Sequence, residues 1–356
     1  MGLRKVLQST ILACGIALIG GAAAVGMGGI STSGLVEAKV EFTQETEAAE
    51  RINPASVETA WRDWMVRNGV THSSLAIGHA GAIMHSSAQM RDPDVAYPMA
   101  SLSKAVTGMC LNQLLTESPY SWDSTLADLA PEFAKMNLTP ATEMADLTLT
   151  QIATHTSGLP KILTYGTTSI RSTNLSSQPT MTRAALGEPS NFGPRGSRIY
   201  SNANYAILGF LIEAMTAEPY ADYCAAQIMM PAGATQASVT GRMSYTAGYG
   251  GWSVSVEDYA RFAMYWFDPA QPWMETPANF AYDGSAHYGM GTNVYPRQVG
   301  TYVSHNGRWT HNDPQKPNIG ALFFVRADGV TVVVNWDKSL DYALYDELYQ
   351  VLQDAL

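Results

Sequence analysis

Ser101 and Lys104 are the two residues whose types and spacing point most directly to chemistry. Pro98 stops any earlier helix, and apolar residues then recur at helical spacing, which places both side chains on one helix face. A serine hydroxyl is a poor nucleophile until a base removes its proton. A lysine can be that base where desolvation and a helix N-terminus favour its neutral form. The alternative is a helix cap followed by a solvated lysine, but the chain has only seven lysines.

Two further short motifs carry groups that are useful in catalysis. Tyr200 and Asn202 stand at the start of an apolar helical stretch, and His305 and Gly307 follow a stretch predicted to be a strand. Taken alone, the first motif is typical of a buried tyrosine with a helix-capping asparagine. The second alone is typical of a structural histidine at the end of a strand.

Composition and charge exclude several classes of function. The 356 residues carry a formal net charge of −10 and only 15% charged residues, which argues against nucleic acid or an anionic membrane surface as the main partner. No spacing of Cys or His is typical of a metal site, and a metalloenzyme using His155, His305 and His311 fits no common ligand pattern. We therefore expect no metal and no cofactor, and we expect the scattered histidines to be ordinary surface and core residues.

The first 53 residues are predicted to lie outside the folded domain. Residues 1–30 combine a short basic start, a long uncharged run and small residues at a candidate cleavage site, which indicates a signal peptide or an uncleaved membrane anchor. Residues 31–53 are acidic and form a linker. The chain is expected to be exported to the periplasm or the outer face of a bacterial membrane, touching the membrane only through this segment. Cys110 and Cys224, each on an apolar helical stretch, are predicted to be buried small hydrophobic residues and not a disulfide.

The remaining pattern predicts an α/β (α+β) fold. A helix beginning at Pro54 is followed by a β-hairpin at 74–85. Later strands are predicted at 288–294, 300–304, 319–326 and 330–336, with helices at 256–266 and 340–356. Between them, 117–244 is mainly helical and contains a long surface loop at 162–198. We predict one antiparallel sheet domain from 54–116 and 245–356, flanked by the N- and C-terminal helices, with 117–244 as an inserted helical domain and a ligand cleft between the two.

The order of the three motifs resembles the serine β-lactamase and penicillin-binding-protein superfamily. Ser-x-x-Lys, Tyr-x-Asn and His-x-Gly follow one another at intervals of about a hundred residues, and the stretch from Thr154 to Pro160 also matches. The branch that it resembles most contains class C β-lactamases, D-alanyl-D-alanine carboxypeptidases and esterases of the same fold. The resemblance covers roughly residues 50–356 and implies the β-lactamase/transpeptidase-like architecture.

The resemblance implies a role for each catalytic residue. Ser101 would be the acylated nucleophile and Lys104 its base. Tyr200 would pass a proton to the leaving group and activate water, with its pKa lowered by a nearby Lys104 ammonium.

The resemblance also implies the substrate-binding residues. Asn202 would bind the acyl-side amide or position Lys104, and His305 with Gly307 would form one wall. The backbone N–H groups of Ser101 and Arg308 would form the oxyanion hole.

His305 stands where class C β-lactamases usually have lysine. A mostly neutral histidine holds an anionic β-lactam less well, and the direction of the Arg308 side chain does not follow from the sequence. We therefore expect a serine hydrolase that acts on small ester, amide or peptide substrates, with cell-wall fragments as one candidate source. The alternatives are a true class C-like β-lactamase and a non-catalytic peptidoglycan-binding or sensor module. Trp252, Trp309 and Tyr288 either line an aromatic pocket or belong to the core.

Overall fold

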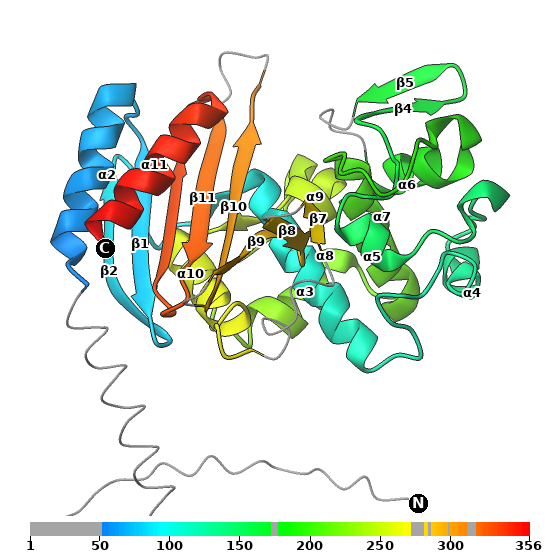
Figure 1. The fold of residues 1–356 in the computed structure, drawn as a ribbon, viewed down its shortest axis with the longest axis horizontal. Helices are drawn as coiled ribbons and strands as arrows, with labels where there is room; N and C mark the ends of the chain where they lie inside the picture. Colours follow the sequence, from blue (N-terminus) through cyan, green and yellow to red (C-terminus); the bar gives the residue numbers. More distant parts are fainter. Residues whose placement is uncertain (1–51, 172–176, 272–280, 284–285, 298–299, 312–317) are drawn as a thin grey trace, which may run out of the picture. The chain divides into compact units, whose positions relative to one another are not determined.

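An eight-stranded antiparallel sheet forms the centre of the fold, in the order β2-β1-β12-β11-β10-β9-β8-β7 (Figure 1). The computed structural model describes residues 52–171, 177–271, 281–283, 286–297, 300–311 and 318–356, all within one compact unit, Glu45–Leu356. The strands are β1 (Ser73–His79), β2 (Ala82–Gln89), β7 (Ala281–Asp283), β8 (Ala286–Gly289), β9 (Thr292–Arg297), β10 (Gly300–Trp309), β11 (Ile319–Val325) and β12 (Thr331–Trp336). The N-terminal hairpin pairs with the last strand, so both ends of the folded unit meet in one sheet.

The predictions for 1–30 and for most of 31–53 lie outside the described residues. Within the described ranges, no helix has both the length and the apolar character needed to cross a bilayer.

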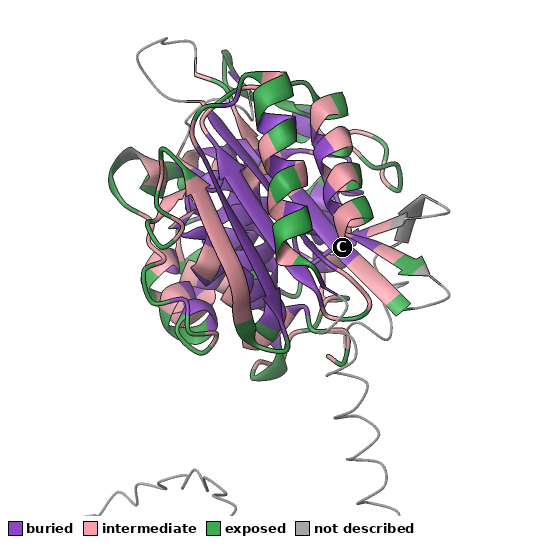
Figure 2. Ribbon diagram, turned by 90° about the vertical axis from the view of Figure 1, so that its left-hand side faces the viewer, coloured by how far each residue is buried: buried purple, intermediate pink, exposed green. Residues whose placement is uncertain are grey.

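Two hydrophobic cores lie on opposite faces of the sheet. Along β11, Leu322 and Phe324 pack into one core, while Phe323 and Val325 pack into the other, as the alternation of a strand requires. Helices α2 (Pro54–Asn68) and α11 (Tyr342–Ala355) cover the first face (Figure 2).

Residues 100–266 build the other layer. A short helix η1 (Ala100–Leu102) leads into α3 (Ser103–Thr116), and α10 (Val256–Trp266) packs on the sheet itself. Two small pairings are β3 (Tyr97–Pro98) with β6 (Ser253–Val254) and the hairpin β4 (Ile162–Tyr165) with β5 (Thr168–Arg171). The other helical segments are α4 (Ala130–Lys135), η2 (Thr142–Met144), α5 (Leu149–Ala153), α6 (Gln178–Gly187), η3 (Pro189–Asn191), α7 (Asn202–Thr216), α8 (Tyr220–Cys224), η4 (Ala225–Met229), η5 (Gly241–Thr246) and α9 (Ala247–Gly250).

The prediction of a long surface loop at 162–198 was wrong. The described part of this stretch contains the β4–β5 hairpin and α6, whose Met181 and Ala184 are fully buried. Ser177 caps α6 by accepting a hydrogen bond from the Thr180 N–H. Ser177, one of the residues that suggested a loop, is therefore a helix cap.

The single strand predicted at 288–294 is in fact two strands, β8 and β9. Met290 (φ 50°) and Gly291 (φ 73°) form a left-handed turn between them. This turn rests on α3, because a Cβ on Gly291 would lie 2.1 Å from the carbonyl of Lys104. The glycine is required here by both its backbone angle and the close approach.

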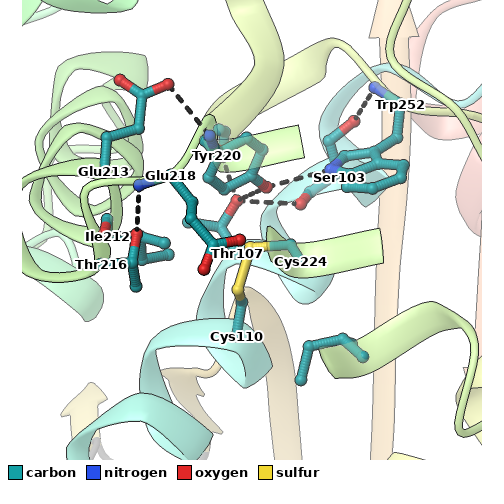
Figure 3. The surroundings of a disulfide bond; sticks show 12 residues. Ser103, Thr107, Cys110, Ile212, Glu213, Thr216, Glu218, Tyr220, Cys224 and Trp252 are labelled. Carbon is teal, nitrogen blue, oxygen red and sulfur yellow. Dashed lines mark hydrogen bonds between the residues drawn. A yellow bond between two sulfur atoms is a disulfide. The ribbon is translucent and has the colours of Figure 1, made fainter. Parts of the chain in front are cut away.

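Cys110 and Cys224 form a disulfide, so the prediction that they are unpaired was wrong. Both are buried on helices as expected, but α3 and α8 pack with the two Cα atoms 5.6 Å apart. Figure 3 shows the polar contacts around the disulfide, where the Thr107 hydroxyl lies 2.7 Å from the Tyr220 hydroxyl. The Thr107 hydroxyl also donates to the Gly248 carbonyl at 2.6 Å. Helix α3 is therefore held by a covalent bond at Cys110 and by hydrogen bonds at Thr107.

Candidate active site

Ser101 lies in the tight turn η1 that precedes α3. The Met99 N–H donates to the Trp252 carbonyl at 2.9 Å, and Ala100 has a left-handed backbone (φ 47°). Behind the turn stands β10 at Gly307, where a Cβ would lie 2.3 Å from the Met99 carbonyl oxygen. Gly307 is needed so that β10 can approach the turn that carries Ser101.

Lys104 is fully buried directly beneath Ser101. Its Nζ lies 3.1 Å from Ser101 Oγ and donates to the Tyr249 carbonyl at 2.7 Å. Burial lowers the pKa of Lys104 well below its ordinary value, because an ammonium loses its hydration there. The structure therefore favours the neutral amine, which is the form that can accept the serine proton.

Tyr200 completes the group around Ser101. Its ring centroid lies 5.0 Å from Lys104 Nζ, and its hydroxyl hydrogen-bonds with the Ser101 side chain. Burial raises the pKa of Tyr200 and outweighs that hydrogen bond. The predicted lowering of this pKa was therefore wrong, because the desolvation that lowers the pKa of Lys104 also disfavours a phenolate at Tyr200.

Ser101 lines a cavity of about 310 Å³. A second cavity, of about 320 Å³, is described in a later section. The cavity at Ser101 is also lined by Asn202, Arg308, Trp309, Thr310 and Tyr342. Asn202 is the first residue of α7, and Ser201 occupies the cap position that the sequence suggested for the asparagine.

Arg308 projects into the cavity at Ser101, which answers the question that the sequence left open. Its guanidinium carbon lies 5.2 Å from the ring centroid of Tyr342. In the part of the chain that the structure describes, it forms no ion pair with a carboxylate. The cavity therefore contains one cation whose charge is available to a ligand.

His305 lies within β10, and its ring is not a cation in this structure. Its Nδ1 donates to the Asn306 carbonyl at 2.6 Å, and its Nε2 accepts from the Tyr288 hydroxyl at 2.9 Å. Burial lowers the pKa of His305 to about 3. Tyr288 and Trp252 are core residues, whereas Trp309 lines the cavity at Ser101.

His155 is the residue at this site that sequence reasoning missed. It is fully buried in a left-handed conformation (φ 63°), and its Nδ1 accepts from Asn204 Nδ2 at 3.0 Å and from the Ser201 N–H at 3.4 Å. Its carbonyl accepts from the Ile199 N–H at 2.9 Å, and its ring centroid lies 4.4 Å from that of Tyr200. His155 thus holds both neighbours of Tyr200. The Thr154–Pro160 match was the one signal that could have drawn attention to it.

The imidazole of His155 has a second distinctive feature. Because Nδ1 accepts two hydrogen bonds, the ring hydrogen of the neutral form is on Nε2. That nitrogen is buried and has no hydrogen-bond partner among the described residues. Burial also lowers the pKa of His155 well below its ordinary value, so the ring stays uncharged. Across the same described ranges, no group of His, Cys, Asp or Glu side chains is arranged to hold a metal ion.

Comparisons with known proteins identify the family to which the chain is similar. The family model described as Beta-lactamase matches residues 64–353. Protein flp of Staphylococcus aureus (strain COL) is 30% identical over 146 residues, which is 41% of this chain but only 28% of that protein. The chain therefore spans little more than a quarter of that curated relative.

Two solved structures share the fold. A β-lactamase/D-alanine carboxypeptidase from Pseudomonas syringae superposes with a TM-score of 0.66 at 15% identity, covering 85% of this chain and 98% of that one. A D-amino acid amidase from Ochrobactrum anthropi SV3, complexed with L-phenylalanine amide, gives a TM-score of 0.63 at 17% identity, covering 85% and 97%. At these identities the likeness establishes the mixed helix and antiparallel-sheet fold alone.

Proposed function

Because this chain belongs to the β-lactamase family, we propose that it is a serine hydrolase that cleaves ester or amide bonds through an acyl-enzyme. The observation that carries the proposal is the buried Lys104 amine, 3.1 Å from Ser101 Oγ. A solvated lysine after a helix cap would be exposed and charged, and it would not meet the serine. The presence of Ser101, Lys104 and Tyr200 in one group also argues against a purely non-catalytic binding module.

In the first half of the reaction, the neutral Lys104 amine takes the proton of Ser101 as Oγ bonds to the substrate carbonyl carbon. The carbonyl oxygen becomes an oxyanion, which the backbone N–H groups of Ser101 and Arg308 stabilise. The bond to the leaving group then breaks and the acyl-enzyme forms. The leaving oxygen or nitrogen takes a proton from the Tyr200 hydroxyl, which regains one from the Lys104 ammonium.

Water completes the reaction. As its oxygen bonds to the acyl carbon, its proton passes to Lys104, directly or through Tyr200, and Ser101 Oγ leaves with a proton returned to it. Tyr200 acts as a relay that stays protonated between steps, because its raised pKa disfavours a lasting phenolate.

Arg308 supports a substrate that carries an anionic group. The neutral His305 cannot supply a cation, whereas the Arg308 guanidinium lines the cavity at Ser101. A carboxylate beside the scissile bond is found in peptides that end in a D-amino acid and also in β-lactams. Within the expected ester and amide substrates, Arg308 favours peptides that end in a D-amino acid, and a class C-like β-lactamase activity is the second candidate.

The experiment is intact mass spectrometry after incubation with a fluorophosphonate, combined with turnover assays. The substrates are a p-nitrophenyl ester, a D-alanyl-D-alanine peptide and a chromogenic cephalosporin. Wild type should gain one label and turn over the ester, and Ser101→Ala should do neither. Ser244→Ala, at an exposed serine, is the matched control and should behave as wild type. Fast cephalosporin turnover would favour the second candidate, and an unlabelled, inactive wild type would refute the hydrolase.

Arg308→Met tests the substrate assignment. Charge-assisted hydrogen bonds are worth about 1.5–3 kcal/mol, so KM for a carboxylate-bearing ester should rise roughly tenfold to a hundredfold. KM for the matched neutral ester should hardly change. An equal change for both esters would contradict the assignment of Arg308 to the substrate carboxylate.

We also propose that the protein works outside the cytoplasm. The proposal is supported by the basic and uncharged composition of residues 1–30 and by the Cys110–Cys224 disulfide, a bond that persists in oxidising compartments. A C-terminal alkaline phosphatase fusion should be active in bacteria, and deletion of residues 1–30 should abolish that activity. An inactive fusion with the full N-terminus would contradict export.

A further inference from the structure

The cavity of about 320 Å³ mentioned above lies on the other face of β10 from Ser101. Gly307 faces the Ser101 turn, so the pleat directs Tyr302, Ser304 and Asn306 to the opposite face. The register places Tyr295 beside Tyr302 and Asn293 beside Ser304. We call this space the β10 outer cavity; it is lined by these five residues, by α11, and by His305 and Leu322.

The β10 outer cavity stands at the margin of the helical layer. Helix α11 contributes Asp346 and Tyr349 to one wall, and the strands form the floor. Figure 2 shows α2 and α11 side by side across the sheet, with further strands extending past the helix pair. The β10 outer cavity thus lies beside α11, where its floor is the strands.

Several polar side chains of the β10 outer cavity have unused hydrogen-bonding capacity. Ser304 is only 9% exposed, yet in the described part of the chain its hydroxyl has no partner. The same ranges contain no hydrogen-bond partner for the amides of Asn293 and Asn306 and no ion-pair partner for Asp346. These polar groups line the cavity and can hydrogen-bond to a ligand that both donates and accepts.

We propose that the β10 outer cavity binds a sugar ring. Its described lining has no lysine or arginine and includes the carboxylate of Asp346, which disfavours an anion. The side-chain amides of Asn293 and Asn306 both donate and accept, as sugar hydroxyls do. The aromatic ring of Tyr302, which lines the cavity, supplies an apolar surface of the kind that packs on the C–H face of a pyranose.

An organic ammonium fits this lining less well than a sugar. An ammonium only donates hydrogen bonds, so the NH₂ groups of Asn293 and Asn306 would stay unmatched in its presence. A volume near 320 Å³ is at the small end for ligand sites and suits a ring-sized molecule. The proposal does not depend on the hydrolase assignment, because Asn293, Asn306 and Asp346 take no part in the reaction described above.

Saturation-transfer NMR on the full chain tests the proposal, with N-acetylglucosamine and methyl β-glucoside as separate probes. Wild type should give a saturable signal for at least one of the two sugars. Asn306→Leu and Tyr302→Ala should each weaken that binding at least tenfold. Asp346→Asn changes an exposed helix position that should not affect folding, and it should also weaken binding measurably.

Two controls separate the β10 outer cavity from other sites. Trp309→Ala alters the cavity at Ser101 and should leave sugar binding unchanged, as should Tyr265→Ala at an exposed tyrosine of α10. The proposal is overturned if neither sugar binds saturably, or if Trp309→Ala abolishes binding while folded Asn306→Leu and Asp346→Asn retain it. Displacement of the sugars by tetramethylammonium at equal concentration would also overturn it, in favour of a cation site.

Discussion

Removing the Cys110–Cys224 disulfide should lower the stability of the fold while leaving the reactive pair in place. The variant is Cys110→Ala with Cys224→Ala, because alanine leaves no unpaired polar group in a buried site. The bond joins residues separated by 114 positions. For a loop of that size the chain-entropy relation gives about 5 kcal/mol at 25 °C, and measured losses are typically about 2–4 kcal/mol.

The expected change in melting temperature follows from the size of the unit. At about 2.1 cal/mol/K per residue, unfolding of Glu45–Leu356 carries an entropy of about 0.65 kcal/mol/K. A loss of about 2–5 kcal/mol then lowers Tm by roughly 3–8 °C. Ester turnover at 25 °C should stay within about twofold of wild type, because the Thr107–Tyr220 and Thr107–Gly248 hydrogen bonds also hold α3.

Calorimetry of wild type, reduced wild type and the double variant measures this effect. Reduced wild type and the double variant should melt together, below oxidised wild type. Thiol titration of the unfolded, non-reduced protein should detect no thiol other than that of Cys14, the one remaining cysteine. Two further titratable thiols would show that the bond does not form, and an unchanged Tm in the double variant would refute the entropic reasoning.

Three further predictions concern the reactive group. Activity should rise with pH as Lys104 loses its proton, at a pH below the ordinary lysine range. The free energy of unfolding should fall as pH falls towards the lowered pKa of Lys104, because in that range the unfolded chain binds a proton that the folded chain does not. An activity profile that is flat through that range would contradict the role of Lys104 as the base. His155→Leu should lower kcat for the ester about tenfold to a hundredfold with KM unchanged, since one to two misplaced hydrogen bonds cost about 1.5–3 kcal/mol. His155→Asn keeps a hydrogen-bond acceptor, tolerates the left-handed backbone and should retain most activity. Equal kcat values in the two folded variants would show that His155 does not position Tyr200. Gly291→Ala should reduce both Tm and kcat, because the new Cβ would clash with the Lys104 carbonyl. Gly81→Ala has a similar φ and open space around it, so it should cost only about 1–2 kcal/mol of stability. Similar losses of activity in both variants would refute the claim that the turn at Gly291 positions Lys104.

The pairing of Ser101 with Lys104 could be predicted because it depends on one turn of helix, which the spacing of apolar residues reveals. The sheet was predictable for a similar reason, since its strands alternate and turn at recognisable residues. The disulfide was not, because which two helices pack together is decided by tertiary contacts between residues far apart in the chain. His155 was missed because its importance lies in a left-handed backbone and in bonds to Ser201 and Asn204, none of which has a local sequence pattern.

The pKa of Tyr200 shows a different limit. The sequence gives charge but not burial, and a neighbouring lysine was therefore expected to act as an ammonium. Once Lys104 is fully enclosed, desolvation dominates for both groups and the direction for the tyrosine reverses. The direction of such a pKa shift can be predicted only when the burial of both groups is known from the three-dimensional structure.

Strand β10 gives one chain segment two independent sets of selective constraints. Val303 and Gly307 face the core and the Ser101 turn, whereas Tyr302, Ser304 and Asn306 line the β10 outer cavity. In a saturation mutagenesis of this strand, fitness under selection for hydrolysis should therefore vary with a period of two. The two faces can accumulate substitutions separately, so one strand allows the chemistry at Ser101 and the surface opposite to it to evolve at different rates.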